Sequence, residues 1–119
     1  MDDFRLGAIE MRFADMIWDR EPLSSGELVK LCAKELSWKK STTYTVLRKL
    51  CDRGLFQNVD GTVTSRITRQ EYRSLQSQSF LEENFSGSLP LFLTAFSARR
   101  KLTEEEIGQL QQLIDSQRG

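Results

Sequence analysis

The chain of 119 residues contains no histidine and only two cysteines. Without histidine it has no imidazole base for a serine–histidine triad and no imidazole ligand for a transition metal. Cys32 and Cys51 lack CxxC spacing, and two thiolates cannot complete a zinc site without carboxylates. These absences argue against an enzyme, against a cofactor and against a structural metal.

The chain also lacks a long apolar run and a net charge. No run approaches the roughly 18 residues of a membrane-spanning helix, and the N-terminus has no signal-peptide pattern. We therefore expect a soluble cytoplasmic protein with reduced thiols and no membrane partner. The 17 basic and 17 acidic side chains balance, but residues 37–73 hold 8 basic and 3 acidic groups between acidic flanks. A basic middle segment predicts a local anion-binding surface.

The order of periodic segments predicts the fold. Three helical patterns precede a hairpin signal at Asp60-Gly61, and three more follow it. Ser24-x-x-Glu27 and Thr103-x-x-Glu106 have the spacing of capping boxes that open helices. This order is that of a mainly α protein with a small β-hairpin: a winged helix-turn-helix over residues 1–73, then a helical dimerisation region over residues 74–119. The expected helices cover residues 6–20, 24–36, about 40–53, 68–85, 89–98 and 103–115.

The C-terminal helices are too apolar on too many faces to pack on one small neighbour. They more plausibly bury against a second copy of the chain, which predicts a homodimer. The candidate dimerisation residues are Phe85, Leu89, Phe92, Leu93, Phe96, Ile107, Leu110, Leu113 and Ile114.

The third expected helix separates into two faces. Thr43, Val46, Leu47 and Leu50 form an inward stripe. The outer face begins with small hydroxyls and continues with cations, which suits a helix entering the DNA major groove: hydroxyls approach base edges and cations reach phosphates. The alternative is a solvated helix whose N-terminus is capped by Ser and Thr. The candidate base-reading residues are Ser41, Thr42 and Thr45, and the candidate DNA-backbone residues are Lys39, Lys40, Arg48, Lys49 and Arg66.

Two long segments, LGAIEMRFADMIW and LSSGELVKLCAKELSWKKSTTYTVLRKLCDRGLF, resemble the penicillinase-repressor (BlaI/MecI/CopY-type) family of bacterial winged-helix transcriptional repressors. Phe85-Ser86-Gly87-Ser88 is similar to the family's F-x-G-S turn, so the resemblance covers nearly the whole chain. The family positions present here are Leu6, Gly7, Glu10, Trp18, Trp38, Thr42, Thr45, Leu47, Leu50 and Gly54.

The resemblance implies a homodimeric repressor with the helix at about 40–53 in the major groove of a palindromic double-stranded DNA operator. It places base reading on Thr42 and Thr45 and phosphate binding on Lys49. Ser41 stands where the family often has a basic residue. For Tyr44, packing against the first or second helix and DNA contact are equally compatible with the sequence.

This chain departs from the family pattern at several places. Its hairpin is about three residues shorter, and Thr62 stands where a wing arginine is expected, so Arg66 or Arg69 would have to replace that cation. No cysteine follows Cys51, which excludes copper sensing through a C-terminal cysteine cluster. The shortened wing and the zero net charge also motivate an alternative function, a winged-helix protein-interaction module with weak or non-specific DNA binding.

The family's penicillinase repressors are inactivated by proteolysis at an Asn-Phe bond, which this chain replaces with Ala95-Phe96. We interpret Phe96 as part of the dimer core. The resemblance therefore suggests a regulatory protease as a partner, but the cleavage sequence that such a protease would need is not present at this position.

Overall fold

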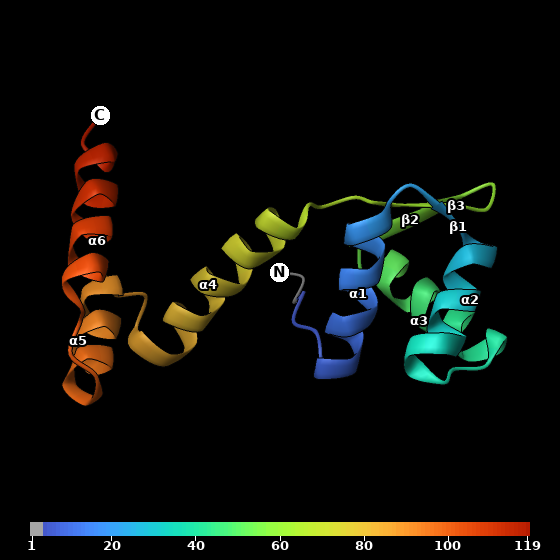
Figure 1. The fold of residues 1–119 in the computed structure, drawn as a ribbon, viewed down its shortest axis with the longest axis horizontal. Helices are drawn as coiled ribbons and strands as arrows, with labels where there is room; N and C mark the ends of the chain where they lie inside the picture. The colour runs from blue at the N-terminus through green and yellow to red at the C-terminus, as the bar shows by residue number, and fades with distance from the viewer. Residues whose placement is uncertain (1–3) are drawn as a thin grey trace. The chain divides into compact units, whose positions relative to one another are not determined.

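The computed structural model describes residues 4–119, which divide into two compact units, one ending at Ser77 and one beginning at Gln78. The described residues form six helices and one three-stranded antiparallel sheet, which confirms the predicted mainly α class with a small hairpin. The elements, labelled in Figure 1, are α1 (Ala8–Arg20), β1 (Leu23–Ser24), α2 (Ser25–Leu36), α3 (Lys40–Asp52), β2 (Phe56–Val59), β3 (Thr62–Ser65), α4 (Arg69–Phe85), α5 (Leu89–Arg99) and α6 (Glu104–Gln117).

Local signals fix several element ends. At the start of α2, Ser24 Oγ accepts the Glu27 N–H at 3.0 Å, and Glu27 Oε1 accepts the Ser24 N–H at 3.2 Å. Thr103 and Glu106 form the same reciprocal cap on α6, so both predicted capping boxes are confirmed. The hairpin turns at Asp60 and Gly61, whose φ angles of 51° and 82° give the left-handed pair that a tight two-residue hairpin requires.

The sheet contains one strand that the sequence analysis did not predict. β1 pairs antiparallel with β3, opposing Leu23 to Val63, and β3 pairs in turn with β2 in the spatial order β1-β3-β2. Two residues are too few to show an alternating pattern. β1 forms because one edge of β3 is not paired with β2, and the backbone groups of that edge pair with Leu23 and Ser24.

The core of the first unit lies between α1, α2, α3 and the inner face of the sheet (Figure 1). Phe13, Phe56 and Leu50 are fully buried, and each such side chain contributes roughly 1.5–3 kcal/mol relative to an exposed position. Ile9 lies in the first turn of α1, ahead of the core, and is 49% exposed.

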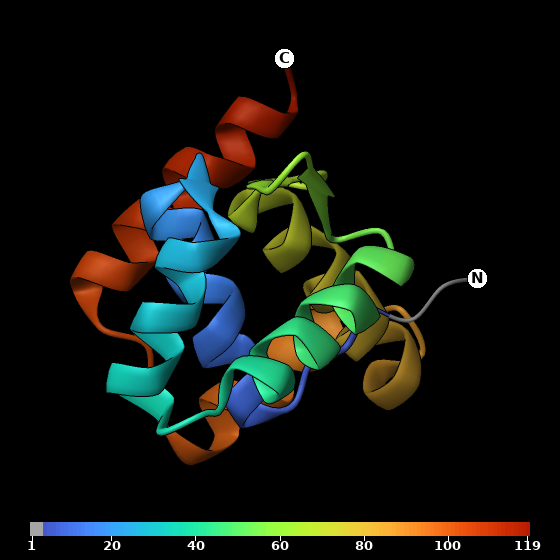
Figure 2. The ribbon, with the colours of Figure 1, turned by 90° about the vertical axis from the view of Figure 1, so that its right-hand side faces the viewer.

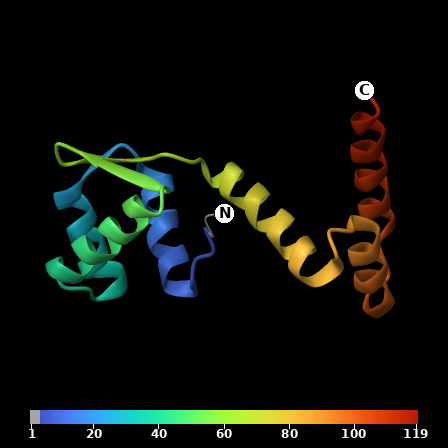
Figure 3. The same ribbon diagram turned by 180° about the vertical axis from the view of Figure 1, so that it is seen from behind.

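The second unit contains the last residues of α4 together with α5 and α6. Figure 3 shows α4 as one continuous helix after the extended segment that follows β3. No residue from Gln78 to Gly119 is buried, although α5 and α6 carry many large apolar side chains. Within residues 4–119, no helix combines the length and the apolar character needed to cross a bilayer.

Candidate nucleic-acid interface

Helix α3 buries one face and exposes the other. Thr43, Leu47 and Leu50 are each at most 2% exposed, as the periodicity predicted. Figure 2 shows α3, in green, running across the front of the first unit. Small hydroxyls therefore occupy the solvent side of its N-terminal half, and cations follow them. The exposed side chains on this face are Ser41, Thr42, Thr45, Arg48 and Lys49.

The threonines of α3 differ in how their hydroxyls are used. Thr43 Oγ1 donates to the Lys39 carbonyl at 3.3 Å, and Thr45 Oγ1 donates to the Ser41 carbonyl at 2.9 Å. Thr42 has no hydrogen-bond partner for its side chain among residues 4–119. Thr42 can therefore donate a hydrogen bond to an outside acceptor, whereas Thr45 has only its methyl group and oxygen lone pairs to offer.

The N-terminus of α3 has no side-chain cap. The N-cap residue is Lys39, whose side chain makes no capping hydrogen bond, and Ser41 and Thr42 lie inside the helix. The Ser/Thr cap of the alternative interpretation is thus wrong, whereas its solvated helix face agrees with the exposed residues of α3. The unpaired N–H groups of a first turn, together with the positive end of the helix dipole, favour an anion at such a terminus.

The candidate cations are not equivalent. Lys39, Lys40 and Arg48 are exposed, but Lys49 Nζ lies 3.0 Å from Glu10 Oε2 of α1. Glu10 also accepts the Gly7 N–H at 3.1 Å. The Gly7 hydrogen bond, and then the Lys49 hydrogen bond, lower the pKa of Glu10 below its ordinary value. Glu10 therefore partly neutralises Lys49, whose side chain is 61% exposed and whose ammonium keeps further donors for a phosphate.

The wing itself carries no cation. Residues 56–65 contain no Lys or Arg, and its turn presents Asp60 beside the exposed Val59. Arg66 follows β3 and is exposed, so it lies next to the wing as predicted. Arg69 does not replace the missing wing arginine, because its guanidinium contacts Asp15 and Asp19 of α1.

Tyr44 links α3 to the rest of the unit. Its hydroxyl donates to Ser25 Oγ at 3.1 Å, and the Ser25 N–H donates to the carbonyl of Gly61 in the wing turn at 2.8 Å. Of the two roles left open by the sequence, the structure shows the packing role, against the start of α2. This chain of contacts holds α3, α2 and the wing turn in a fixed relation.

The second unit presents an unusual number of exposed apolar side chains. Phe92 contacts the rings of Phe80, Phe85 and Phe96 at centroid distances of 5.4 to 6.2 Å, so the aromatic residues do form a cluster. Even so, Phe92 is only half-buried. The α5–α6 surface consists of the large apolar residues that are 38% to 56% exposed: Leu89, Leu91, Phe96, Ile107, Leu113 and Ile114.

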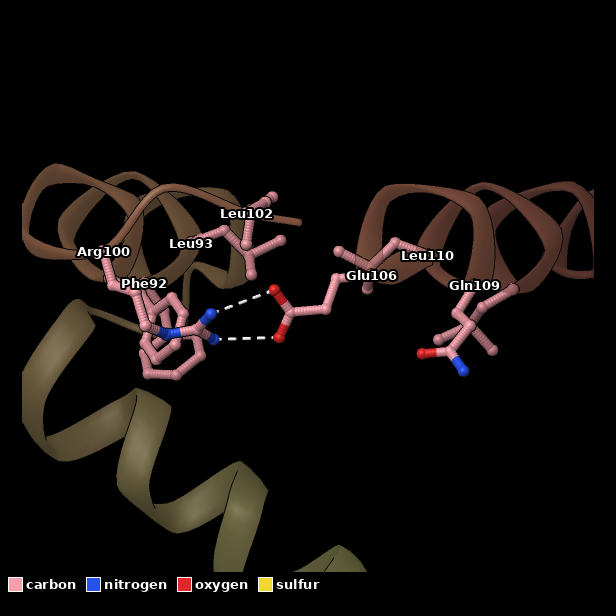
Figure 4. Close-up of a pocket in the computed structure, with 9 residues that line it drawn as sticks. Phe92, Leu93, Arg100, Leu102, Glu106, Gln109 and Leu110 are labelled. Carbon is pink, nitrogen blue, oxygen red and sulfur yellow. Dashed lines mark hydrogen bonds and ion pairs between the residues drawn. The ribbon is translucent and has the colours of Figure 1, made fainter. Parts of the chain in front are cut away.

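A pocket of about 350 Å³ lies in this unit between α5 and α6 (Figure 4). Arg100 closes one side, donating two hydrogen bonds of 3.0 and 2.9 Å to the Glu106 carboxylate. These bonds, with that of the Thr103 N–H, lower the pKa of Glu106 to about 2. The remaining lining is mainly apolar, formed by Phe92, Leu93, Phe96, Leu102, Gln109, Leu110 and Leu113.

The sequence analysis missed the residues that hold the interface in place. Glu21 accepts both the N–H and the hydroxyl of Ser65 at 2.8 Å, which joins the end of α1 to the end of β3. Glu10 joins α1 to α3 through Lys49, and Arg69 joins α4 to α1 through Asp15. Contacts between residues 39 to 54 positions apart leave no periodic signal in a single sequence. The one local signal was Thr68-x-x-Glu71, a reciprocal cap at the start of α4.

Comparison with known proteins agrees with this arrangement. A family model described as penicillinase repressor matches residues 6–116. A penicillinase repressor from Bacillus licheniformis is 28% identical over 110 residues, covering 89% of this chain and 86% of the relative. The family match includes α3 and residues 78–116 of the second unit.

Proposed function

The chain belongs to the penicillinase-repressor family, which indicates a DNA-binding transcriptional regulator, and we propose that it is a homodimeric repressor of a palindromic operator. Helix α3 would enter the major groove of each half-site. The observation that carries this proposal is the solvent-facing hydroxyl surface of α3, with cations on both sides and an uncapped N-terminus.

Base reading is assigned to Ser41, Thr42 and Thr45. Small side chains let the helix backbone approach the base edges, where a hydroxyl or a methyl group can make the contact. The free hydroxyl of Thr42 suits a hydrogen bond to a base acceptor. Thr45 has donated its hydroxyl to Ser41, so its methyl group suits the C5-methyl of thymine.

Phosphate binding is assigned first to the exposed cations near α3 and second to Arg66 after the wing. Lys39, Lys40 and Arg48 are exposed and make no ion pair within the described residues. Lys49 would contribute less, because Glu10 partly neutralises its charge. Because the wing has no Lys or Arg, most of the electrostatic attraction comes from α3 and its preceding turn.

The homodimer is assigned to the helical region over residues 74–119, with residues 1–73 binding DNA. Support comes from the absence of any buried residue between Gln78 and Gly119 despite the apolar α5–α6 surface. A unit with an exposed surface of this kind gains stability by burying it against a second copy. Phe96 belongs to this surface, and we assign it to the dimer and not to a protease-cleavage site.

A second candidate function is a protein-interaction module with weak DNA binding. It is favoured by the wing, which presents Asp60 and Val59 where a DNA-binding wing would present a cation. A stoichiometric protein partner, retained without DNA, would support this alternative.

A salt titration of DNA binding tests the phosphate contacts. Counting only the cations assigned first, Lys39, Lys40 and Arg48, a dimer makes about six phosphate contacts, and each contact contributes roughly −0.9 to the slope of log affinity against log salt. Affinity is therefore expected to fall about a thousandfold between 50 and 200 mM salt.

Two substitutions that each remove one positive charge test whether the salt dependence comes from the cations near α3. Lys40→Gln is expected to reduce the magnitude of the slope by about two, one contact in each protomer. Lys101→Gln removes the same charge from the α5–α6 connection and should leave the slope unchanged. A flat salt dependence in the unaltered protein would contradict the proposed interface.

A further inference from the structure

A small pocket of about 180 Å³ lies between α3 and β2, the first strand of the wing. All of its lining residues belong to the first unit. They are Tyr44, Leu47, Arg48 and Cys51 from α3 and Asn58 from β2. Because Arg48 is also one of the exposed cations of α3, the pocket adjoins the surface that is proposed to contact DNA.

Asn58 lies on the face of the sheet that is turned toward α3. It is two residues from Phe56 in β2 and directly opposite Val63 in β3, and side chains at these positions share one face of an antiparallel pair. Phe56 and Val63 are fully buried, whereas Asn58 is exposed. The inner face of the sheet therefore ends in a solvent-accessible amide at the pocket.

The two walls of the pocket are held together by hydrogen bonds on both sides. Where α3 leads into the wing, the Leu55 N–H donates to the Leu50 carbonyl at 3.1 Å. At the wing turn, the Tyr44 hydroxyl donates to Ser25 Oγ, and the Ser25 N–H donates to the Gly61 carbonyl. The backbones on the two sides are thus fixed before a ligand arrives, which lowers the ordering cost of binding.

The polar groups of the pocket are hydrogen-bond donors without partners. In the described part of the chain, Arg48 makes no ion pair and the Asn58 amide makes no hydrogen bond. No acidic side chain lines the pocket. Burial raises the pKa of the Cys51 thiol, so its sulfur is uncharged near neutral pH. A guanidinium and an amide beside an uncharged wall suit the oxygens of a phosphate.

We propose that the pocket between α3 and β2 receives a phosphate of the DNA backbone, held by Arg48 from α3 and by Asn58 from the wing. This inference rests on the proposed function, because it requires α3 to face DNA. A small phosphate anion has the same chemistry, but the exposed hydroxyls and cations of α3 beside the pocket favour the DNA backbone as its source. The wing then contacts DNA through a neutral donor, although it has no Lys or Arg.

Affinity for double-stranded DNA of unrelated sequence is the first measurement, because a phosphate contact carries no sequence information. Asn58→Ala should lower this affinity roughly tenfold or more, since a hydrogen bond to a charged group is lost. The slope of log affinity against log salt should stay the same, because the amide is neutral. Arg48→Gln should lower the affinity and also reduce the magnitude of the slope.

Two further variants separate a phosphate contact from an effect on the wing itself. Gln57→Ala is the matched control, because it removes the neighbouring amide from the outer face of β2, where that amide donates to Thr64 Oγ1 at 3.0 Å. It should bind DNA like the unaltered protein. Asn58→Asp keeps the shape of the side chain but turns a carboxylate toward the phosphate, so it should bind less tightly than Asn58→Ala. Equal melting temperatures of Asn58→Ala and the unaltered protein are expected, because the amide has no partner to lose.

Alkylation by N-ethylmaleimide gives a second measurement at the pocket itself. Cys51 lines the pocket and is half-buried, whereas Cys32 is fully buried and serves as the unreactive reference. A saturating concentration of duplex DNA should slow the labelling of Cys51 several-fold, because the bound phosphate closes the pocket. Inorganic phosphate, at the same concentration of phosphate groups, should leave the labelling rate unchanged.

The outcomes distinguish this proposal from the proposed function. Equal DNA affinities of Asn58→Ala and Gln57→Ala, or labelling of Cys51 that DNA does not slow, would overturn the pocket. Equal protection by inorganic phosphate would overturn the assignment to the DNA backbone. A protein that selects no DNA sequence fails the proposed function, but its affinity for unrelated duplexes still decides whether the pocket holds a phosphate. A protein that binds no duplex refutes both.

Discussion

Replacing Leu113 with glutamate is expected to convert the proposed dimer into monomers and to weaken operator binding by roughly 100-fold or more. Leu113 is 56% exposed in the single chain and lines the pocket between α5 and α6. A glutamate there would be solvated in a monomer, but in a dimer it would place a charge in an apolar interface. Burying this charge costs free energy only in the dimer, so the substitution favours the monomer.

Sedimentation equilibrium and operator titration on the same samples measure both effects. Gln112→Glu is the matched control, because it adds the same charge at the neighbouring exposed position of α6. The control should remain dimeric and bind the operator normally. A Leu113→Glu protein that stays dimeric would show that the α5–α6 surface is not the interface.

The second large effect concerns the hydroxyl surface of α3. Removing both candidate base contacts with Thr42→Ala and Thr45→Ala should lower operator affinity by about 30-fold or more, since each half-site loses two contacts that contribute roughly 1–3 kcal/mol each. Binding to unrelated DNA should change little, because that binding depends on the cations. The two threonines lie on the solvent side of α3, so the fold should not be affected.

Valine substitutions distinguish the two contacts. Thr42→Val should cost nearly as much as Thr42→Ala, because the hydroxyl that it loses has no partner within the described protein. Thr45→Val should bind almost normally, since the methyl group is retained and the hydroxyl hydrogen is already donated to Ser41. Thr94→Val is the matched control, a helical threonine bonded to the Pro90 carbonyl in the same way. Equal losses at positions 42 and 45 would contradict the assigned roles.

Much of the fold could be predicted because its signals are local. The capping boxes at Ser24 and Thr103 and the hairpin turn at Asp60-Gly61 each depend on residues within three or four positions of one another. The family resemblance, based on the order and spacing of such motifs, is confirmed by the match over residues 6–116. The two faces of α3 followed from the period of the helix alone.

What could not be predicted depends on contacts between distant parts of the chain. β1 needs the edge of β3, and the ion pair between Lys49 and Glu10 needs α3 to lie beside α1. Arg69 was considered as a replacement for the wing arginine, and only the positions of Asp15 and Asp19 show that it has another role. A single sequence does not show which residue a charged side chain contacts in the folded protein.

The central claim is that this chain reads DNA sequence as a symmetric dimer. Selection of binding sites from random double-stranded DNA by the purified full chain tests it most directly. The account predicts an enriched inverted repeat, and its loss from the enriched pool when Thr42→Ala and Thr45→Ala are combined. Enrichment of no sequence, or the same sequence with and without these threonines, would contradict it.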